Sequence, residues 1–236
     1  SSRIMIKIKD LKKIYGNTTV LNIPELTIPK SQCIGLVGNN GAGKTTLFRI
    51  MLDLVRATEG FVSVDEEKVN RGEQWKTKVG AYLDENMLLS YLSPEEYFKA
   101  LIKMYRLSEE DLQLHLDKFS DFFNGEILGS KKYIRDLSKG KIKKVGIAAA
   151  LLGKPEAVLL DEPFENLDPS SQIRLKKLIL KEKEENSVTF LISSHDLNHV
   201  TEICERIVLL EKGIIVRDLE DKSLMTEALN NYFKVS

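Results

Sequence analysis

The chain has 236 residues, of which 42% are hydrophobic and 30% charged, enough apolar material for a sizeable core and too much for intrinsic disorder. The 35 Lys and Arg residues balance the 35 Asp and Glu residues. This zero net charge gives no reason to expect a nucleic-acid partner. Two cysteines are too few for a disulfide framework, so Cys33 and Cys204, both in apolar segments, are expected to be reduced core thiols.

The sequence offers no signal for export or membrane insertion. No charged-then-apolar leader opens it, and apolar stretches such as 147–152 and 157–160 are far shorter than the roughly 20 residues that span a bilayer. We therefore predict a cytoplasmic protein that takes part in a membrane process only through a partner.

The first part of the chain alternates between apolar and polar residues over 4–8 and 20–28, with turn residues at 15–17. This period of two predicts an antiparallel β region. The apolar run Cys33–Val37 predicts a buried strand, and a glycine-rich turn and a helical pattern from Lys44 to about Val55 follow it. A strand, turn and helix in this order open a nucleotide-binding unit. Residues 61–64 alternate again and predict a further strand.

A helical region follows from about Tyr91 to Leu152. Residues 93–96, with the sequence SPEE, form a capping box with proline at the first helical position. We predict helices over 95–105, 109–123 and 138–152, and Gly153 and Pro155 end the last of them. His115 in this region, and His199 further on, are expected to be surface or boundary residues.

The last third alternates predicted strands at 157–160 and 188–192 with helices at 169–185 and 196–204, and ends in a hairpin over 207–216. The whole pattern predicts an α/β fold: a P-loop NTPase core, with a mainly parallel sheet and flanking helices, an N-terminal antiparallel β subdomain and an inserted helical subdomain. We place the helical subdomain at residues 84–152 of a single 236-residue domain, and the β part and P-loop core at 1–83 and 153–236.

Residues 38–45, GNNGAGKT, fit the phosphate-loop pattern G-x-x-x-x-G-K-[ST]. The glycines let main-chain N–H groups surround phosphates, and the following helix adds its positive end. Lys44 is expected to reach the β- and γ-phosphates of ATP, and the Thr45 hydroxyl to ligate Mg²⁺. The nucleotide-binding residues predicted in this loop are Gly38, Asn39, Asn40, Gly41, Ala42, Gly43, Lys44, Thr45 and Thr46.

Residues 157–163, AVLLDEP, are the natural complement of this loop. The predicted strand delivers Asp161 to its carboxyl end, where it can hold Mg²⁺ through water. Glu162 follows directly and is placed to orient and polarise the attacking water. An acidic turn without a catalytic role is the alternative.

With these motifs, the sequence resembles the ABC ATPase family over nearly its whole length. Residues 137–141, LSKGK, are similar to the LSGGQ signature, 166–168 to the D-loop and 193–196 to the H-loop, and Tyr15 matches the aromatic residue that stacks on adenine. The resemblance implies that Ser138 and Gly140 bind nucleotide. It also implies that His195 acts near the γ-phosphate. A packing role for His195 and a plain turn role for Tyr15 remain the alternatives.

Two departures from the family pattern stand out. Lys139 and Lys141 replace a glycine and the glutamine of the signature, and they either face the nucleotide or point to solvent. Asp84, with Glu85 as the alternative, replaces the Q-loop glutamine, so the resemblance implies that Asp84 contacts nucleotide and metal. Acidic Q-loops of this kind resemble the exporter branch that handles bacitracin, lantibiotic-like peptides or other drugs.

The resemblance implies an ATPase subunit that uses ATP and Mg²⁺ and drives a transmembrane permease on another chain, from the inner face of the cell membrane. A second copy of the chain, or a paired cassette, completes the dimer. The alternatives are a soluble ABC ATPase that serves no transporter and a nucleotide-sensing cassette without turnover. The presence of Lys44, Asp161, Glu162 and His195 disfavours the sensor, and the balanced charge disfavours a nucleic-acid role.

Overall fold

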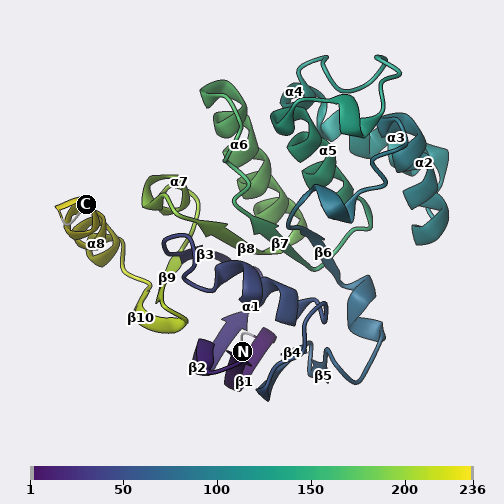
Figure 1. The fold of residues 1–236 in the computed structure, drawn as a ribbon. Helices are drawn as coiled ribbons and strands as arrows, with labels where there is room; N and C mark the ends of the chain where they lie inside the picture. Colours follow the sequence, from purple (N-terminus) through teal and green to yellow (C-terminus); the bar gives the residue numbers. More distant parts are fainter. Residues whose placement is uncertain (1–2, 235–236) are drawn as a thin grey trace.

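The N-terminal part of the chain forms an antiparallel sheet at the bottom of Figure 1. In the computed structural model, which describes residues 3–234, its strand order is β2-β1-β4-β5. The strands are β1 (Ile4–Tyr15), β2 (Thr18–Pro29), β4 (Glu59–Val64) and β5 (Glu67–Lys68). β1 and β2 pair antiparallel along their length and most of their apolar residues are buried, so the predicted antiparallel β region is confirmed.

A second sheet of six strands has the order β10-β9-β3-β8-β7-β6, and only β10 runs antiparallel to its neighbour. Every residue of β3, β7 and β8 is buried, as expected for parallel strands covered on both faces. The predicted P-loop core with a mainly parallel sheet is therefore confirmed. The six strands are β3 (Cys33–Val37), β6 (Val79–Tyr82), β7 (Ala157–Asp161), β8 (Thr189–Ser194), β9 (Arg206–Glu211) and β10 (Ile214–Leu219).

Helix α1 (Lys44–Met51) lies between the two sheets. Its apolar face, which includes Leu47 and Phe48, joins one hydrophobic cluster with residues from both sheets. The helix ends earlier than the predicted Val55 because Asp53 adopts a left-handed conformation, with φ of 57°. The packing fixes the amino end of α1 beside the carboxyl ends of β3 and β7.

The inserted region is helical, as predicted, and packs on the face of the core sheet opposite α1 (Figure 1). The capping box is present: Ser93 Oγ accepts a hydrogen bond from Glu96 N, and the Glu96 carboxylate accepts one from Ser93 N. The predicted helix over 109–123 breaks at the fully buried Phe119 into two helices. The helices are α2 (Pro94–Tyr105), α3 (Glu109–Lys118), α4 (Ser120–Phe123) and α5 (Lys139–Leu152), with short 3-10 turns η1 (Gln74–Thr77), η2 (Glu85–Met87) and η3 (Ile134–Asp136).

Helices α6 (Pro169–Asn186) and α7 (Leu197–Thr201) lie on the same side of the core sheet as the helical region, and α8 (Lys222–Lys234) follows β10. The sequence patterns did not predict α8, and α7 is shorter than the predicted 196–204. Cys33 and Cys204 are both free and buried, with their Sγ atoms 3.2 Å apart. No helix in the described part of the chain is long and apolar enough to cross a membrane.

His115 contradicts the expectation of a surface or boundary position. Its side chain is only 8% exposed, and Nε2 lies 2.8 Å from the carbonyl oxygen of Ala148 in α5. Burial lowers the pKa of His115 to about 4. His199 is half-buried, as expected, and its ring stacks on Phe164 with centroids 4.8 Å apart.

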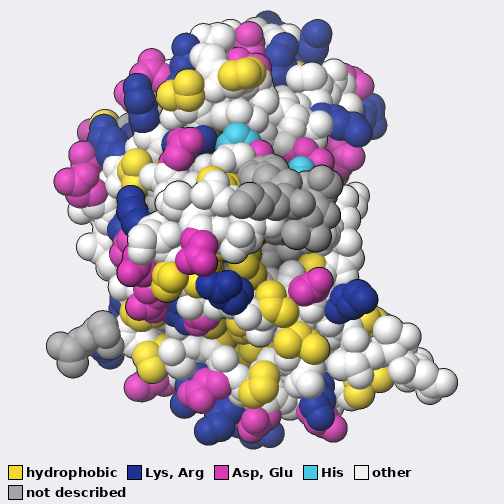
Figure 2. Space-filling view, turned by 90° about the vertical axis from the view of Figure 1, so that its left-hand side faces the viewer, with side chains coloured by type: hydrophobic (Ala, Val, Ile, Leu, Met, Phe, Trp, Pro, Cys, Tyr) yellow, Lys and Arg dark blue, Asp and Glu magenta, His cyan; other side chains and the backbone are white. Residues whose placement is uncertain are grey.

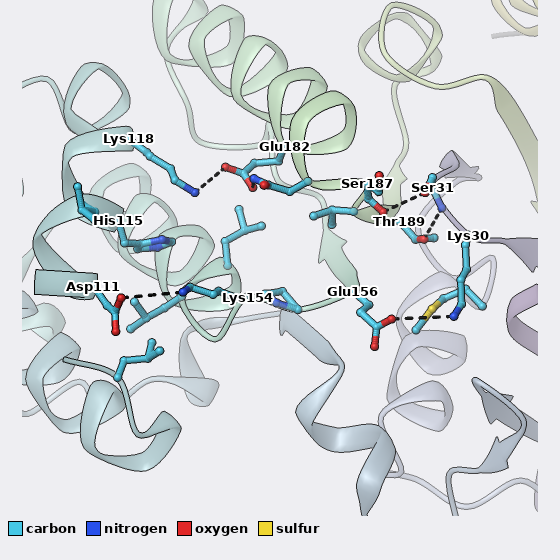
Figure 3. Close-up of a pocket in the computed structure, with 18 residues that line it drawn as sticks. Lys30, Ser31, Asp111, His115, Lys118, Lys154, Glu156, Glu182, Ser187 and Thr189 are labelled. Carbon is cyan, nitrogen blue, oxygen red and sulfur yellow. Dashed lines mark hydrogen bonds and ion pairs between the residues drawn. The ribbon is translucent and has the colours of Figure 1, made fainter. Parts of the chain in front are cut away.

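A cavity of about 530 Å³ lies beside His115, between α3, the end of α6 and the amino ends of β7 and β8 (Figure 3). Two ion pairs lie among the residues that line the cavity: Lys118 with Glu182 at 3.2 Å, and Lys154 with Asp111 at 3.9 Å. Because the phosphate-loop residues follow the carboxyl end of β3, this cavity lies at the opposite edge of the parallel sheet. It does not belong to the nucleotide site.

Candidate nucleotide-binding site

The phosphate loop is held by the ends of neighbouring strands. Gly38 N donates to Ser194 O at 3.2 Å, which joins the loop to the end of β8. A side chain on Gly38 would lie 2.3 Å from the carbonyl oxygen of Leu210, so only glycine fits. Gly43, with φ of 104°, is the residue before α1 and lies against Leu21 of β2. Glycines at these two positions let the loop pass close to Leu210 and Leu21 and lead into the amino end of α1.

Lys44 is buried and donates to two oxygens. One is the carbonyl oxygen of Gly38 within the loop, and the other is Glu162 Oε1 at 3.0 Å. The second contact joins the phosphate loop to the residue after β7. The two motifs, 118 positions apart in the chain, thus meet as the sequence predicted.

Asp161 ends β7 and faces two hydroxyl groups. Thr45 Oγ1 donates to Asp161 Oδ2 at 2.8 Å, and Ser193 Oγ donates to Asp161 Oδ1. A carboxylate and a threonine hydroxyl are the hard oxygen ligands that Mg²⁺ prefers. The chemistry of this donor pair therefore fits a magnesium ion held together with phosphate oxygens.

Glu162 is fixed by contacts at both its carboxylate and its main chain. Oε2 lies 3.0 Å from His195 Nδ1, and the main-chain N–H donates to Ser193 Oγ at 2.9 Å. Its carbonyl oxygen accepts from Lys143 Nζ at 2.6 Å. The backbone has φ of 48°, a left-handed conformation that is uncommon for a residue with a side chain. Lys44 and His195 thus converge on one carboxylate whose own backbone is unusual.

The structure places Tyr15 at the tip of the β1–β2 hairpin, with 52% of the side chain exposed. The ammonium group of Lys13 lies 4.8 Å from the centroid of its ring. The hairpin contacts the phosphate loop, because the neighbouring Leu21 lies against Gly43. The exposed ring of Tyr15 is available for stacking.

The signature segment begins α5. Ser138 is its N-cap residue, and Ser138 Oγ accepts from Lys141 N at 3.3 Å. A side chain on Gly140 would lie 2.5 Å from the carbonyl oxygen of Asn166, so glycine lets this helix approach the D-loop segment. Lys139 is exposed and Lys141 is half-buried. Ser138, Lys139, Gly140 and Lys141 line one shallow hollow with residues 166–168.

Asp84 lies apart from the residues at Lys44. Its carboxylate accepts from Asn86 N at 2.9 Å as the cap of η2 and lies 3.9 Å from Arg49 of α1. Among the described residues no hydrogen bond joins Asp84 to Thr45 or Asp161. Its contact with nucleotide and metal stays a prediction.

Two residues of the site were missed by motif reasoning. Ser193 bridges Asp161 and Glu162, and Lys143 contacts the Glu162 carbonyl. Ser193 could have been noticed as one of the two serines between the predicted strand and His195. Nothing in the sequence distinguishes Lys143 from the three lysines around it at 139, 141 and 144.

A phosphate loop that faces an Asp–Glu pair at the carboxyl edge of a parallel sheet defines a P-loop ATPase. The family model described as "ABC transporter" matches residues 21–165. The chain therefore belongs to the ABC transporter family. It is an ATP-binding subunit, an ATPase that uses ATP and Mg²⁺ and works with a second cassette and a membrane permease.

Curated relatives cover nearly all of the chain. The lantibiotic transport ATP-binding protein SrtF of Streptococcus pyogenes is 32% identical over 235 residues, 96% of this chain and 96% of that protein. The bacitracin transport ATP-binding protein BcrA of Enterococcus faecalis is 32% identical over 226 residues, 93% of this chain and 70% of that protein.

Solved structures agree with the fold. A dimeric structure of the ATP-binding cassette MJ0796, in a post-hydrolysis state with ADP and Pi, matches with a TM-score of 0.80 at 27% identity. The match covers 92% of this chain and 98% of that one. A further dimeric structure of MJ0796 has a TM-score of 0.81 at 28% identity. The predicted fold class and the family are both confirmed.

Proposed function

We propose that Glu162 orients and activates the water that attacks the γ-phosphate of ATP. The observation that carries this proposal is the convergence of Lys44 and His195 on its carboxylate. Glu162 follows β7 directly, next to the Asp161 carboxylate. A carboxylate held this way can accept a proton from water without a change in its own position.

Thr45 and Asp161 would hold the magnesium ion, which when bound neutralises charge on the phosphates. Lys44 donates to Glu162 in this structure, and phosphate oxygens compete for the same ammonium group. ATP binding therefore moves Lys44 from Glu162 to phosphate. The Glu162 carboxylate is then free for water, with His195 still beside it.

The site is completed by a second cassette. Ser138 and Gly140 stand at the amino end of α5 and, in our proposal, donate to the γ-phosphate bound by the partner. Tyr15 stacks on adenine, and the loop residues 38–46 surround the phosphates. The helical subdomain, residues 84–152, faces the permease, and Asp84 lies at its boundary. Exposed apolar side chains there, Met87, Leu89 and Tyr91, support that assignment.

Replacing Glu162 with glutamine tests the water-activating role. Glu162→Gln should retain ATP binding and lower kcat by at least about a hundredfold, the size of a general-base contribution. Glu165→Gln, an exposed carboxylate three residues further on, serves as the control and should keep normal turnover. ATPase assays and equilibrium binding of ATP measure both. Normal turnover in Glu162→Gln would move the base elsewhere, with His195 the next candidate.

We infer further that the transporter is an exporter and that the chain lies on the inner face of the cell membrane. The likeness to lantibiotic and bacitracin transport proteins supports a peptide antibiotic or a related drug as the substrate. Inside-out membrane vesicles that contain the chain and its permease should accumulate labelled bacitracin or lantibiotic when ATP is added. Vesicles with Glu162→Gln should not. Uptake in right-side-out vesicles alone would indicate an importer.

A further inference from the structure

Lys143 is a buried cation in the helix that begins at the signature. Its side chain is 9% exposed, and Nζ donates to the main-chain carbonyl oxygen of Glu162 at 2.6 Å. This contact joins α5 to the residue after β7. The contact is formed within one chain, and its acceptor is the main-chain carbonyl group of Glu162, the proposed base.

Burial of the Lys143 ammonium group at this position costs free energy. Burial lowers the pKa of the Lys143 ammonium group, which means that the protein environment disfavours its charge. An apolar residue would suit this buried stretch of α5, where the neighbours Ile142 and Val145 are apolar and buried. Lys144, the next residue, lies 5.3 Å from the ring of Phe122 instead. Only Lys143 of these residues points to the nucleotide-binding core.

The backbone that Lys143 contacts is the unusual one. Glu162 has φ of 48°, and such a conformation persists only where surrounding contacts fix it. Ser193 Oγ accepts from the N–H of Glu162, and the C=O of Glu162 accepts from Lys143 Nζ at 2.6 Å and, over a longer 3.3 Å, from the main-chain N–H of Glu165. Without Lys143 the carbonyl would keep only the longer bond from Glu165 N–H, and we expect the main chain of Glu162, and with it the direction of the carboxylate, to be less well fixed.

We propose that Lys143 is a positioning residue for hydrolysis: its hydrogen bond to the Glu162 carbonyl sets the direction in which the Glu162 carboxylate meets water. The inference rests on the proposed role of Glu162. Lys143 Nζ donates to the main chain of Glu162. It acts through the backbone of the base.

The test compares Lys143→Met with Lys143→Arg. Methionine has an unbranched side chain of similar length to lysine but no hydrogen-bond donor, whereas arginine keeps a donor. In the full-length chain, Lys143→Met should lower kcat about ten- to a hundredfold, the effect of a small misplacement, with an unchanged KM for ATP. Lys143→Arg should recover part of the loss. Turnover is expressed per mole of bound ATP analogue, so a smaller folded fraction does not count as slower hydrolysis.

His115→Leu is the matched control. His115 also contacts a main-chain carbonyl group, that of Ala148, which lies in α5 like Lys143. It should leave kcat within about twofold, since a lost contact on α5 alone does not move Glu162. An equal loss of kcat in His115→Leu and Lys143→Met would overturn the proposal in favour of general loosening of α5.

A double-mutant cycle separates the inference from the function on which it rests. In a Glu162→Gln background, Lys143→Met should cause no further loss in single-turnover hydrolysis, because there is no base left to position. An additive loss would overturn the inference. Normal turnover in Glu162→Gln alone would refute the proposed function, whereas a slow Glu162→Gln with a normal Lys143→Met would refute only the inference.

Discussion

At the level of single residues, the site is built around the carboxylate of Glu162. The side chain of Glu162 is only 18% exposed. Lys44 provides a full positive charge at 3.0 Å, and His195 lies at the same distance from the other oxygen. The two contacts come from different parts of the chain, α1 and the loop after β8. Small movements of either element on nucleotide binding therefore change the environment of the base directly.

Tyr15 is expected to contribute to nucleotide binding through its ring. Its ring is exposed, and stacking on a purine requires the ring rather than the hydroxyl group. Tyr15→Phe should therefore bind ATP almost normally, whereas Tyr15→Ala should lose roughly 1–3 kcal/mol of binding free energy. Isothermal titration with ATP measures both. Equal affinity for all three proteins would make Tyr15 a turn residue only.

The residues that share a short motif could be predicted from sequence. Glycines at fixed spacing before a Lys-Thr pair, and an Asp-Glu pair after an apolar strand, have few other uses, so they mark Lys44, Thr45, Asp161 and Glu162 as candidate site residues. No motif marks Lys143, because its contact depends on how α5 lies against the end of β7. A lysine in a row of lysines carries no such information in sequence.

At the scale of elements, the helical region is tied together by His115 of α3, which contacts α5. Its burial could not be read from sequence, because α3 has an acidic first turn and a polar composition that indicate a surface helix. The break at Phe119 and the unpredicted α8 have the same origin. In each case packing against distant elements decides the local structure.

This histidine makes stability depend on pH. Burial lowers the pKa of His115 from an ordinary value near 6.5 to about 4 in the folded chain, so the unfolded chain binds more protons between those values. The contribution of neutral His115 is fully present above about pH 6.5 and is lost as the pH falls toward 4. The loss amounts to about 3 kcal/mol of unfolding free energy at most.

Urea unfolding at a series of pH values between about 8 and 4.5 measures this dependence. The free energy of unfolding of the native chain should fall more steeply with decreasing pH than that of His115→Leu. The two curves should be parallel above pH 7, where His115 is neutral in both states. Parallel curves over the whole range would show that the burial of His115 carries no proton linkage.

At the scale of the whole molecule, the charge is balanced and dispersed. Figure 2 shows acidic and basic side chains intermingled on the face that it presents, with no large area of one sign. Partner recognition on that face must therefore rest on shape and on local contacts. The motif residues divide between two places, the phosphate loop at α1 and the signature at α5. This division suits a molecule that pairs with a second copy of itself by two-fold symmetry.

In the proposed dimer, each active site takes its phosphate loop from one chain and its signature from the other. Ser138→Arg blocks the signature and Glu162→Gln removes the base, so each variant alone should be nearly inactive. An equimolar mixture should regain about a quarter of native ATPase activity, because half of the dimers are mixed and each mixed dimer has one intact site. Activity of the mixture no greater than the mean of the two separate variants would contradict the shared site.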